Sequence, residues 1–252
     1  MKLVFAGPSL SGIDKSAFAC RFLPPAAQGD LARAVVEGAT VIGLIDGVYE
    51  TTAAVWHKEI LFALQQGVAV LGGASMGALR AAECAPFGMR AVGSIATRYL
   101  AGELDDDAAV AVVHGPAELD YLPLNEALVD AEATIARLRR LGLVAADEAD
   151  RLVAAARAIF FKRRTAEAIA EQAIPDPSRR AEILAAYAAE HQAQKRADAL
   201  QVVEEVLRLP ARRAPVAAGW TLSEPAFWKA ALREIGAAPA AGGGKRLLAA
   251  DL

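Results

Sequence analysis

The chain has 252 residues, of which 55% are hydrophobic and 23% charged, and its formal net charge is −3. This length accommodates one large domain, or a core domain with a smaller one. The small net charge provides no general attraction to nucleic acid or to an anionic membrane, so neither is expected as a partner. Two cysteines, Cys20 and Cys84, make neither a disulfide framework nor a metal site. No apolar run reaches the roughly 18 residues of a membrane span, and we expect a cytoplasmic protein.

Short apolar strands alternate with helices over the first 116 residues. The sequence predicts strands at residues 2–6, 40–45, 68–71 and 108–113, and helices at 30–37, 53–66 and 94–101. Residues 87–93 are predicted to form a turn-rich connection between two of these elements. Continuous apolar strands separated by helices are typical of a parallel sheet that is covered on both faces. The predicted fold class is therefore α/β, with a mainly parallel sheet and flanking helices.

The second part of the chain has a different pattern. Segments rich in alanine, arginine and glutamate keep a 3.6-residue apolar period from about 124 to 208, with a break near Pro175 and Pro177. A last helix is predicted at 223–235. We therefore expect an α/β domain at 1–116, followed by a helical extension at 117–252.

The most informative stretch is a turn of small residues between an apolar strand and a segment of strongly helix-forming residues. Residues 73–77 read Gly-Ala-Ser-Met-Gly, which has the spacing of a nucleophile elbow. In such a turn Ser75 is exposed at the apex. The backbone N–H groups of Met76 and Gly77 would open the helix, where they favour a developing negative charge. The alternatives are an anion-binding loop, or a tight turn in which Gly73 and its neighbours only pack the helix on the sheet.

Polar residues follow the predicted strands at four places. Ser9, Asp46, Ser75 and His114 each come directly after an apolar run. The carboxyl ends of parallel strands lie at one edge of the sheet, and ligands bind there, where the strand order switches. We therefore expect these four side chains to line one concave edge.

A serine nucleophile needs a base, and two histidines are candidates. His57 lies in the first turns of a predicted helix near Asp46, and His114 follows a predicted strand. We favour His57, oriented by Asp46 or Glu59, as the general base. The alternative is that His57 is a core or capping residue.

Arg80 and Glu83 follow the turn with i, i+3 spacing on one helical face. One reading is a solvated ion pair. The other is that Arg80 reaches over the turn and binds a carboxylate or the terminus of a partner chain.

Several of these segments resemble the TfuA-like family. The resemblance rests on residues 46–47, 55–61, 75–83, 87–89 and 110–114, covers about 46–165, and is most specific at Ser-Met-Gly-Ala-Leu-Arg-Ala-Ala-Glu. Residues 195–200 fit more loosely. The resemblance implies an accessory protein that acts with a YcaO-type, ATP-dependent enzyme. Together they replace a backbone amide oxygen by sulfur in a protein or in a ribosomally made peptide, as in natural-product biosynthesis. A ThiS-like carrier with a C-terminal thiocarboxylate is the implied sulfur source.

The chemistry of the turn fits this role. Release of sulfide from a thiocarboxylate is acyl hydrolysis, which needs a nucleophile, an oxyanion site and an acid for the leaving sulfur. We expect Gly72 and Gly73 to leave room for the carrier tail. The chain has no Walker-type Gly-Lys-Ser/Thr loop, so ATP is assigned to the partner and no cofactor is expected here.

Two other functions stay open. The turn could be a docking surface through which the protein activates the YcaO enzyme without catalysis. The protein could also be a serine hydrolase of a small acyl substrate, although the usual chain order would then require His114. The sequence leaves the oligomeric state open.

Overall fold

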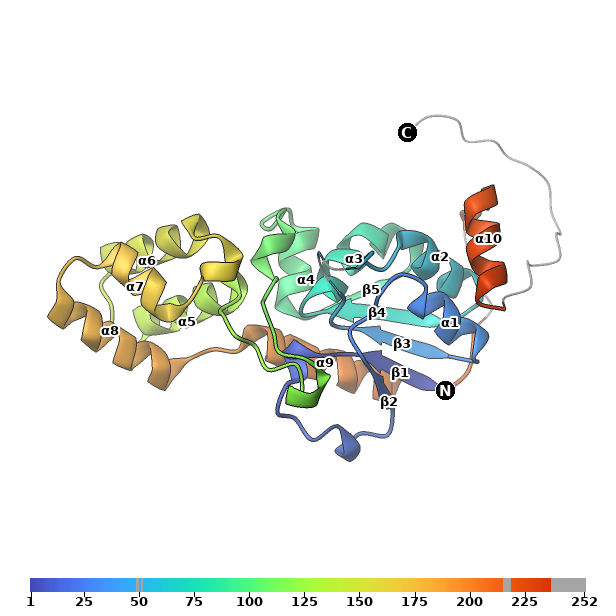
Figure 1. Ribbon diagram of the computed structural model, residues 1–252, viewed down its shortest axis with the longest axis horizontal. Coiled ribbons are helices and arrows are strands. Elements are labelled where there is room, and N and C mark those ends of the chain that lie inside the picture. Colours follow the sequence, from blue (N-terminus) through green and yellow to red (C-terminus); the bar gives the residue numbers. More distant parts are fainter. Residues whose placement is uncertain (49, 51, 215–218, 237–252) are drawn as a thin grey trace.

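The computed structural model describes residues 1–48, 50, 52–214 and 219–236. A five-stranded parallel sheet lies at its centre, with strand order β2-β1-β3-β4-β5 (Figure 1). The strands are β1 (Lys2–Phe5), β2 (Arg21–Leu23), β3 (Val41–Leu44), β4 (Ala69–Gly73) and β5 (Arg90–Val92). The chain leaves β1 towards one edge and then crosses to β3 on its other side, so the strand order switches at β1. The predicted α/β class with a parallel sheet is confirmed.

Helices flank this sheet and extend beyond it. The first group is α1 (Asp30–Val36), α2 (His57–Gln65), α3 (Met76–Cys84) and α4 (Gly93–Leu100). The second part of the chain forms α5 (Leu128–Arg140), α6 (Ala146–Ala158), α7 (Ala166–Ala173), α8 (Pro177–Glu190), α9 (Gln194–Arg208) and α10 (Ala226–Glu234). Short 3-10 turns are η1 (Pro8–Leu10), η2 (Lys15–Ala17), η3 (Ala85–Phe87), η4 (Asp107–Ala109), η5 (Ala117–Leu119) and η6 (Phe161–Arg163). No helix of the described residues is long and apolar enough to cross a membrane.

The alternation of side chains along the strands builds two cores. Leu3 and Phe5 of β1 pack on one face, together with α1, α2 and α10. Val4 points to the other face, where it packs with Val202 and Val206 of α9. Because helices cover both faces, the central strands β1, β3 and β4 are almost continuously apolar, which is the pattern that identified them in the sequence.

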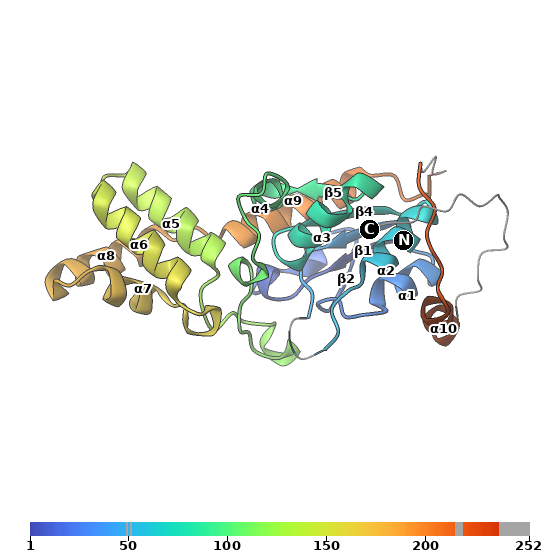
Figure 2. The ribbon, with the colours of Figure 1, turned by 90° about the horizontal axis from the view of Figure 1, so that it is seen from above.

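The C-terminal helices divide between two places. Helices α5 to α8 form a group at one end of the long axis, and both views show them beside the sheet rather than on it (Figures 1 and 2). This group has its own buried cluster, which includes Ile135, Leu152 and Tyr187. Helix α9 then returns along the sheet, where a Cβ at Gly43 would meet Val206 at 2.9 Å. The absence of a side chain at Gly43 therefore lets α9 approach the sheet closely.

The structure corrects the expected strand at 108–113. Asp107–Ala109 forms η4, because the Asp106 carboxylate accepts a hydrogen bond from the Ala108 N–H at 2.8 Å. The following residues lie at the carboxyl edge of the sheet and join no strand of it. The turn-rich connection expected at 87–93 instead contains the edge strand β5, and β2 was not predicted. Both strands have three residues, which is too short for a periodic signal.

Candidate functional site

A cavity of about 570 Å³ opens at the carboxyl ends of β1, β3 and β4. Pro8 follows β1, Asp46 follows β3 and Ser75 follows β4, and all three line the cavity. Residues 110–114 form another wall. The cavity thus lies at the edge and at the strand-order switch where α/β proteins bind ligands, and its volume is within the usual range for ligand pockets. Of the four residues predicted to converge, Asp46, Ser75 and His114 line this cavity, whereas Ser9 does not line it and His114 follows no strand of the described residues.

Ser75 is the N-cap residue of α3, in an unusual turn. The preceding residue, Ala74, has a positive φ of 64° and is fully buried, whereas Ser75 itself has φ −125° and ψ −124°. The turn therefore differs from the expected elbow, because the left-handed residue precedes the serine. The Ser75 Oγ lies 3.5 Å from the carbonyl oxygen of Val110, at the limit of a hydrogen bond. Its hydroxyl is only weakly held and faces the cavity wall.

Strained backbone is concentrated around this cavity. In the described residues, positive φ values outside glycine occur at Glu50, Ala74, Asp120 and Tyr121. Glu50 and Tyr121 line the cavity, and the other two adjoin residues that do. Such conformations cost about 1–3 kcal/mol each and persist where the surrounding structure imposes them, often at functional sites.

The glycines of the turn serve packing rather than access. A Cβ at Gly77 would overlap the carbonyl group of Leu44, and one at Gly72 would overlap the carbonyl of Gly77. A Cβ at Gly73 would likewise overlap the carbonyl oxygen of Val92. These glycines let α3 lie directly against the sheet. The expectation that Gly72 and Gly73 leave room for a carrier tail is wrong, because backbone fills that space.

The two predicted oxyanion donors differ in their contacts. The Gly77 N–H donates to the Ile45 carbonyl at 3.0 Å, so it is not available to a ligand. The Met76 N–H makes no hydrogen bond to any described residue. It therefore remains the candidate donor beside Ser75, at the N-terminus of α3.

Asp46 holds the two strand ends together. Its carboxylate accepts hydrogen bonds from the Gly7 N–H at 2.8 Å, the Ser9 N–H at 3.0 Å and the Ser9 hydroxyl at 2.7 Å. Asp46 and Ser9 are 1% and 4% exposed. These contacts fix η1 against the end of β3, across the strand-order switch. The structure thus pairs Asp46 with Ser9, whereas we expected Asp46 to orient a histidine.

Lys195 was not predicted as a site residue. It comes from the first turn of α9, is 4% exposed, and its Nζ donates to the Val110 carbonyl at 2.6 Å. This is the same carbonyl that lies beside the Ser75 hydroxyl. Burial lowers the pKa of the Lys195 ammonium, although the carboxylates of Asp46 and Asp130 act in the opposite direction. The loose resemblance at 195–200 was the one sequence signal for this residue.

Asp130 completes the buried charge cluster. Its Oδ1 accepts a hydrogen bond from the Lys195 backbone N–H at 2.8 Å, which anchors the start of α9 to α5. Burial raises the pKa of the Asp130 carboxyl to about 6, against the effect of the nearby Lys195 ammonium. The lysine therefore lies between two carboxylates in a site with little water.

His57 lies outside the cavity. Its ring is about half exposed, and Nε2 lies 2.8 Å from the carboxylate of Glu83. Arg80 also pairs with Glu83, at 2.7 Å, and donates to the Val55 carbonyl. Although burial opposes them, these hydrogen bonds from His57 and Arg80 lower the pKa of Glu83. The structure supports the ion-pair reading of Arg80 and does not bring His57 or Arg80 to Ser75.

His114 does line the cavity. Its Nδ1 lies 2.7 Å from the carbonyl oxygen of Gly115, and its ring packs edge-on against Tyr121 with centroids 5.7 Å apart. These two contacts orient the ring. Of the two proposed bases, only His114 is thus found at the cavity.

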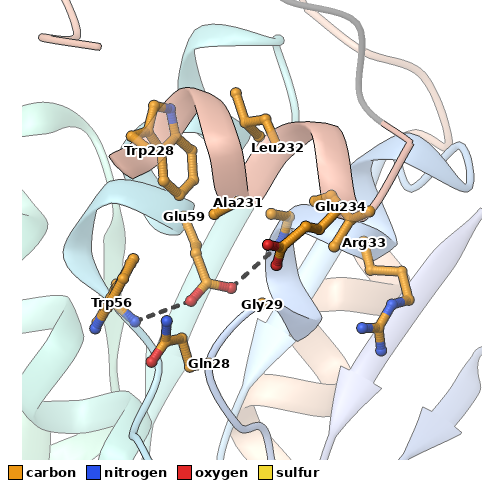
Figure 3. Close-up of a pocket in the computed structure, with 11 residues that line it drawn as sticks. Gln28, Gly29, Arg33, Trp56, Glu59, Trp228, Ala231, Leu232 and Glu234 are labelled. Carbon is orange, nitrogen blue, oxygen red and sulfur yellow. Dashed lines mark hydrogen bonds between the residues drawn. The ribbon is translucent and has the colours of Figure 1, made fainter. Parts of the chain in front are cut away.

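Glu59 lies in a separate, smaller cavity of about 160 Å³ beneath α10 (Figure 3). The carboxylate is fully buried and accepts hydrogen bonds from the backbone N–H groups of Trp56 at 3.1 Å and Ala32 at 3.4 Å. Trp228 of α10 packs over it. Burial raises the pKa of Glu59, and the backbone hydrogen bonds oppose that rise. The contacts of Glu59 join the first turns of α1 and α2, and none of them reaches His57.

These features define an α/β protein with a serine-bearing cavity at the carboxyl edge of a parallel sheet, and a buried lysine behind the cavity wall at Val110. Residues 46–165 match the model of the TfuA-like protein family, so the chain carries a TfuA-like domain. The matched segment contains Asp46, Ser75 and the cavity wall at 110–114. The match confirms the resemblance seen in the sequence and supports a role linked to thioamidation with YcaO-type enzymes. No curated protein matches the chain.

Proposed function

We propose that this protein hydrolyses the thiocarboxylate at the end of a ThiS-like carrier protein and supplies the released sulfide to a YcaO-type enzyme. One observation carries the proposal: the Ser75 hydroxyl, which lines the cavity at the strand ends, and the buried Lys195 ammonium approach the same carbonyl oxygen, that of Val110. A serine hydroxyl and a buried amine at one carbonyl oxygen place a nucleophile and a base in the same neighbourhood, as nucleophilic acyl chemistry uses them.

The reaction is written in two steps. In the first, the Ser75 oxygen attacks the thiocarboxylate carbon as its proton passes to the neutral amine of Lys195. The C–S bond breaks and sulfide leaves, with the proton available from Lys195 to form HS⁻. In the second, water attacks the acyl-serine ester, which releases the carrier carboxylate and a proton and restores the hydroxyl. The Met76 N–H, next to Ser75 at the N-terminus of α3, is the proposed donor to the developing oxyanion.

Lys195 is the preferred base because of its surroundings. A lysine accepts a proton near neutral pH only if its pKa is lowered, and burial has this effect here. The predicted base His57 is instead engaged by Glu83 at the surface. His114, whose ring lines the same cavity, is the alternative proton carrier.

The partner would provide ATP-dependent activation of the amide. A role of this chain as a non-catalytic activator is the second candidate, and the contacts of one arginine favour it. Buried Arg164 donates to the carbonyls of Ala156 and Ile159 at the end of α6 and to the Ala108 carbonyl beside the cavity wall. A partner that binds the α5–α8 group could thus influence the wall.

The deciding experiment mixes the protein with a thiocarboxylated carrier and measures sulfide, with and without the YcaO enzyme. Wild-type protein should release sulfide in both mixtures, whereas Ser75→Ala should not. Ser178→Ala, at an exposed position in the first turn of α8, is the matched control and should retain full activity. If Ser75→Ala turned over the carrier at the wild-type rate, the catalytic proposal would be replaced by the activator.

A further inference from the structure

A further cavity, of about 300 Å³, lies behind the wall of the cavity that Ser75 lines. Pro8 and Val112 line both spaces, so a single layer of chain separates them. Lys195 lines the further cavity, whereas Ser75 lines the first. The two spaces are called the Lys195 cavity and the Ser75 cavity below. The Lys195 cavity offers the lysine a way to solvent that a ligand in the Ser75 cavity does not cover.

Charged side chains from three parts of the chain gather in the Lys195 cavity. Glu126 and Asp130 come from the start of α5, His191 from the end of α8, and Arg196 from the first turn of α9. A space of this volume holds several water molecules, and the polar side chains supply hydrogen-bond partners for them. The cavity is therefore suited to water and to the movement of protons.

Asp130 is the carboxylate of this cavity that can accept a proton from Lys195. Its Oδ1 accepts the Lys195 backbone N–H at 2.8 Å, and its Oδ2 has no hydrogen-bond partner among the described residues. Asp46, the other carboxylate near the lysine, already accepts three hydrogen bonds. Burial raises the pKa of Asp130 to about 6 and lowers the pKa of Lys195. A proton therefore passes between them at a smaller cost than between an ordinary lysine and aspartate.

Glu126 and His191 connect the cavity to the surface. The His191 Nε2 lies 3.0 Å from the Glu126 Oε1, and the two side chains are 39% and 16% exposed. The hydrogen bond with Glu126 raises the pKa of His191, whereas burial and the charge of Arg196 act against that rise. A histidine in this position exchanges protons with solvent near neutral pH.

We propose that the Lys195 cavity is the route by which protons leave Lys195 for solvent, with Asp130 as the acceptor and the Glu126–His191 pair as the exit. The inference rests on the proposed function, in which thiocarboxylate and water give carboxylate, HS⁻ and one proton per turnover. In the second step, Lys195 carries a proton from water to the Ser75 oxygen and then takes the proton that the new carboxylic acid loses. The lysine must release this proton before it can act as a base again, while the carrier still fills the Ser75 cavity.

The test compares Asp130→Asn with the wild type in weakly buffered solution over a range of carrier concentrations. Asparagine keeps an oxygen that can accept the Lys195 N–H, but it cannot carry a proton. We expect kcat for sulfide release to fall at least about fivefold. The ratio kcat/KM covers only the steps up to sulfide release, so it should not fall. Asp150→Asn on α6, whose side chain is 76% exposed, is the matched control and should keep both constants.

Imidazole provides a substitute for the missing proton carrier. At saturating carrier the Ser75 cavity is occupied, so imidazole reaches Lys195 through the Lys195 cavity. It should restore kcat of Asp130→Asn to within about twofold of the wild type. PIPES, a bulkier buffer of similar pKa, should not. Because Asp130 is buried, the exposed end of the route gives a second variant: His191→Gln should lower kcat alone, and imidazole should restore it.

The outcomes separate the proton route from the hydrolysis. The route would be overturned by an unchanged kcat in Asp130→Asn, by an equal fall in kcat and kcat/KM with an unchanged unfolding midpoint, or by equal rescue with both buffers. Failure of imidazole to rescue either variant would overturn it as well. In all these cases sulfide is still released, so the proposed function would stand. Absence of sulfide release by the wild-type protein would overturn the proposed function and the route with it.

Discussion

The hydroxyl of Ser75 and the ammonium of Lys195 are directed at the same carbonyl oxygen, that of Val110, at 3.5 Å and 2.6 Å. The two residues are 120 positions apart in the sequence and come from helices on opposite faces of the sheet. They meet because α3 and α9 both begin at the carboxyl edge. This relationship connects the TfuA-like segment to a helix outside the matched residues.

Ser75→Ala should abolish sulfide release and preserve the fold. The hydroxyl makes one long hydrogen bond, and alanine fits the same turn, so we expect an unchanged midpoint of chemical denaturation. Loss of the nucleophile should lower turnover of the thiocarboxylated carrier by at least about 10³-fold. Thioamide formation by the YcaO enzyme should recover when free sulfide is added. Failure of free sulfide to restore it would indicate that the protein acts as an activator.

Lys195→Met should remove the pH dependence of kcat/KM that arises from the titration of the buried amine. Because burial lowers the pKa of Lys195, kcat/KM of the wild type should rise with pH along a limb whose apparent pKa lies below the ordinary value of 10.5. The reason is that the neutral amine, which accepts the Ser75 proton, increases as pH rises.

The matched variant is Lys195→Arg, which keeps the charge but cannot lose its proton. It should retain the fold and lose most of the activity, and neither variant should show the wild-type limb. A limb that persists in Lys195→Met would assign the base to another group, of which His114 is the first candidate.

His57→Ala should leave sulfide release within about twofold of the wild-type rate, as expected for an exposed residue remote from the cavity. Its contact with Glu83 lies at the surface, where such ion pairs contribute about 0–1 kcal/mol. The check is the initial rate with saturating carrier. A large fall in the rate of sulfide release with an unchanged unfolding midpoint would support His57 as the general base.

Gly77→Ala should destabilise the protein by about 3 kcal/mol or more, because the new Cβ would overlap the Leu44 carbonyl and neither backbone can yield easily. Chemical denaturation followed by circular dichroism measures the change. Gly219→Ala is the control, since a Cβ there has open space and no positive φ to overcome. Equal stability of the two variants would show that α3 can move away from β3.

Much of the fold could be predicted from the sequence, because local patterns carry it. The strands at β1, β3 and β4 are continuous apolar runs, and the predicted helix at 30–37 begins and ends within one residue of α1. The turn at Ser75 was found from its glycines. Asp46 and Ser75 were placed at the cavity by the rule that parallel strands end at one edge, whereas His114 reaches it although the strand predicted before it does not form.

The incorrect predictions have physical causes, some local in the sequence and others dependent on tertiary contacts. At 108–113, the side chain of Asp106 caps a turn, and this local hydrogen bond overrides the apolar pattern. At Gly72 and Gly73, the sequence indicated a tight turn, but only the tertiary structure showed which backbone fills the space beside them. His57 was close to the expected edge along the chain, whereas its helix directs the ring towards Glu83.

The sequence by itself determined the class of fold, the position of the turn and the family of its central segment, since apolar periodicity and glycine spacing are local properties. Only the tertiary structure brought Lys195 and Ser75 to the Val110 carbonyl and placed residues 110–114 along a cavity. A lysine in an alanine-rich amphipathic helix resembles any surface residue in sequence. Its burial and lowered pKa arise from the docking of α9 against the sheet, which depends on contacts between residues far apart in the chain.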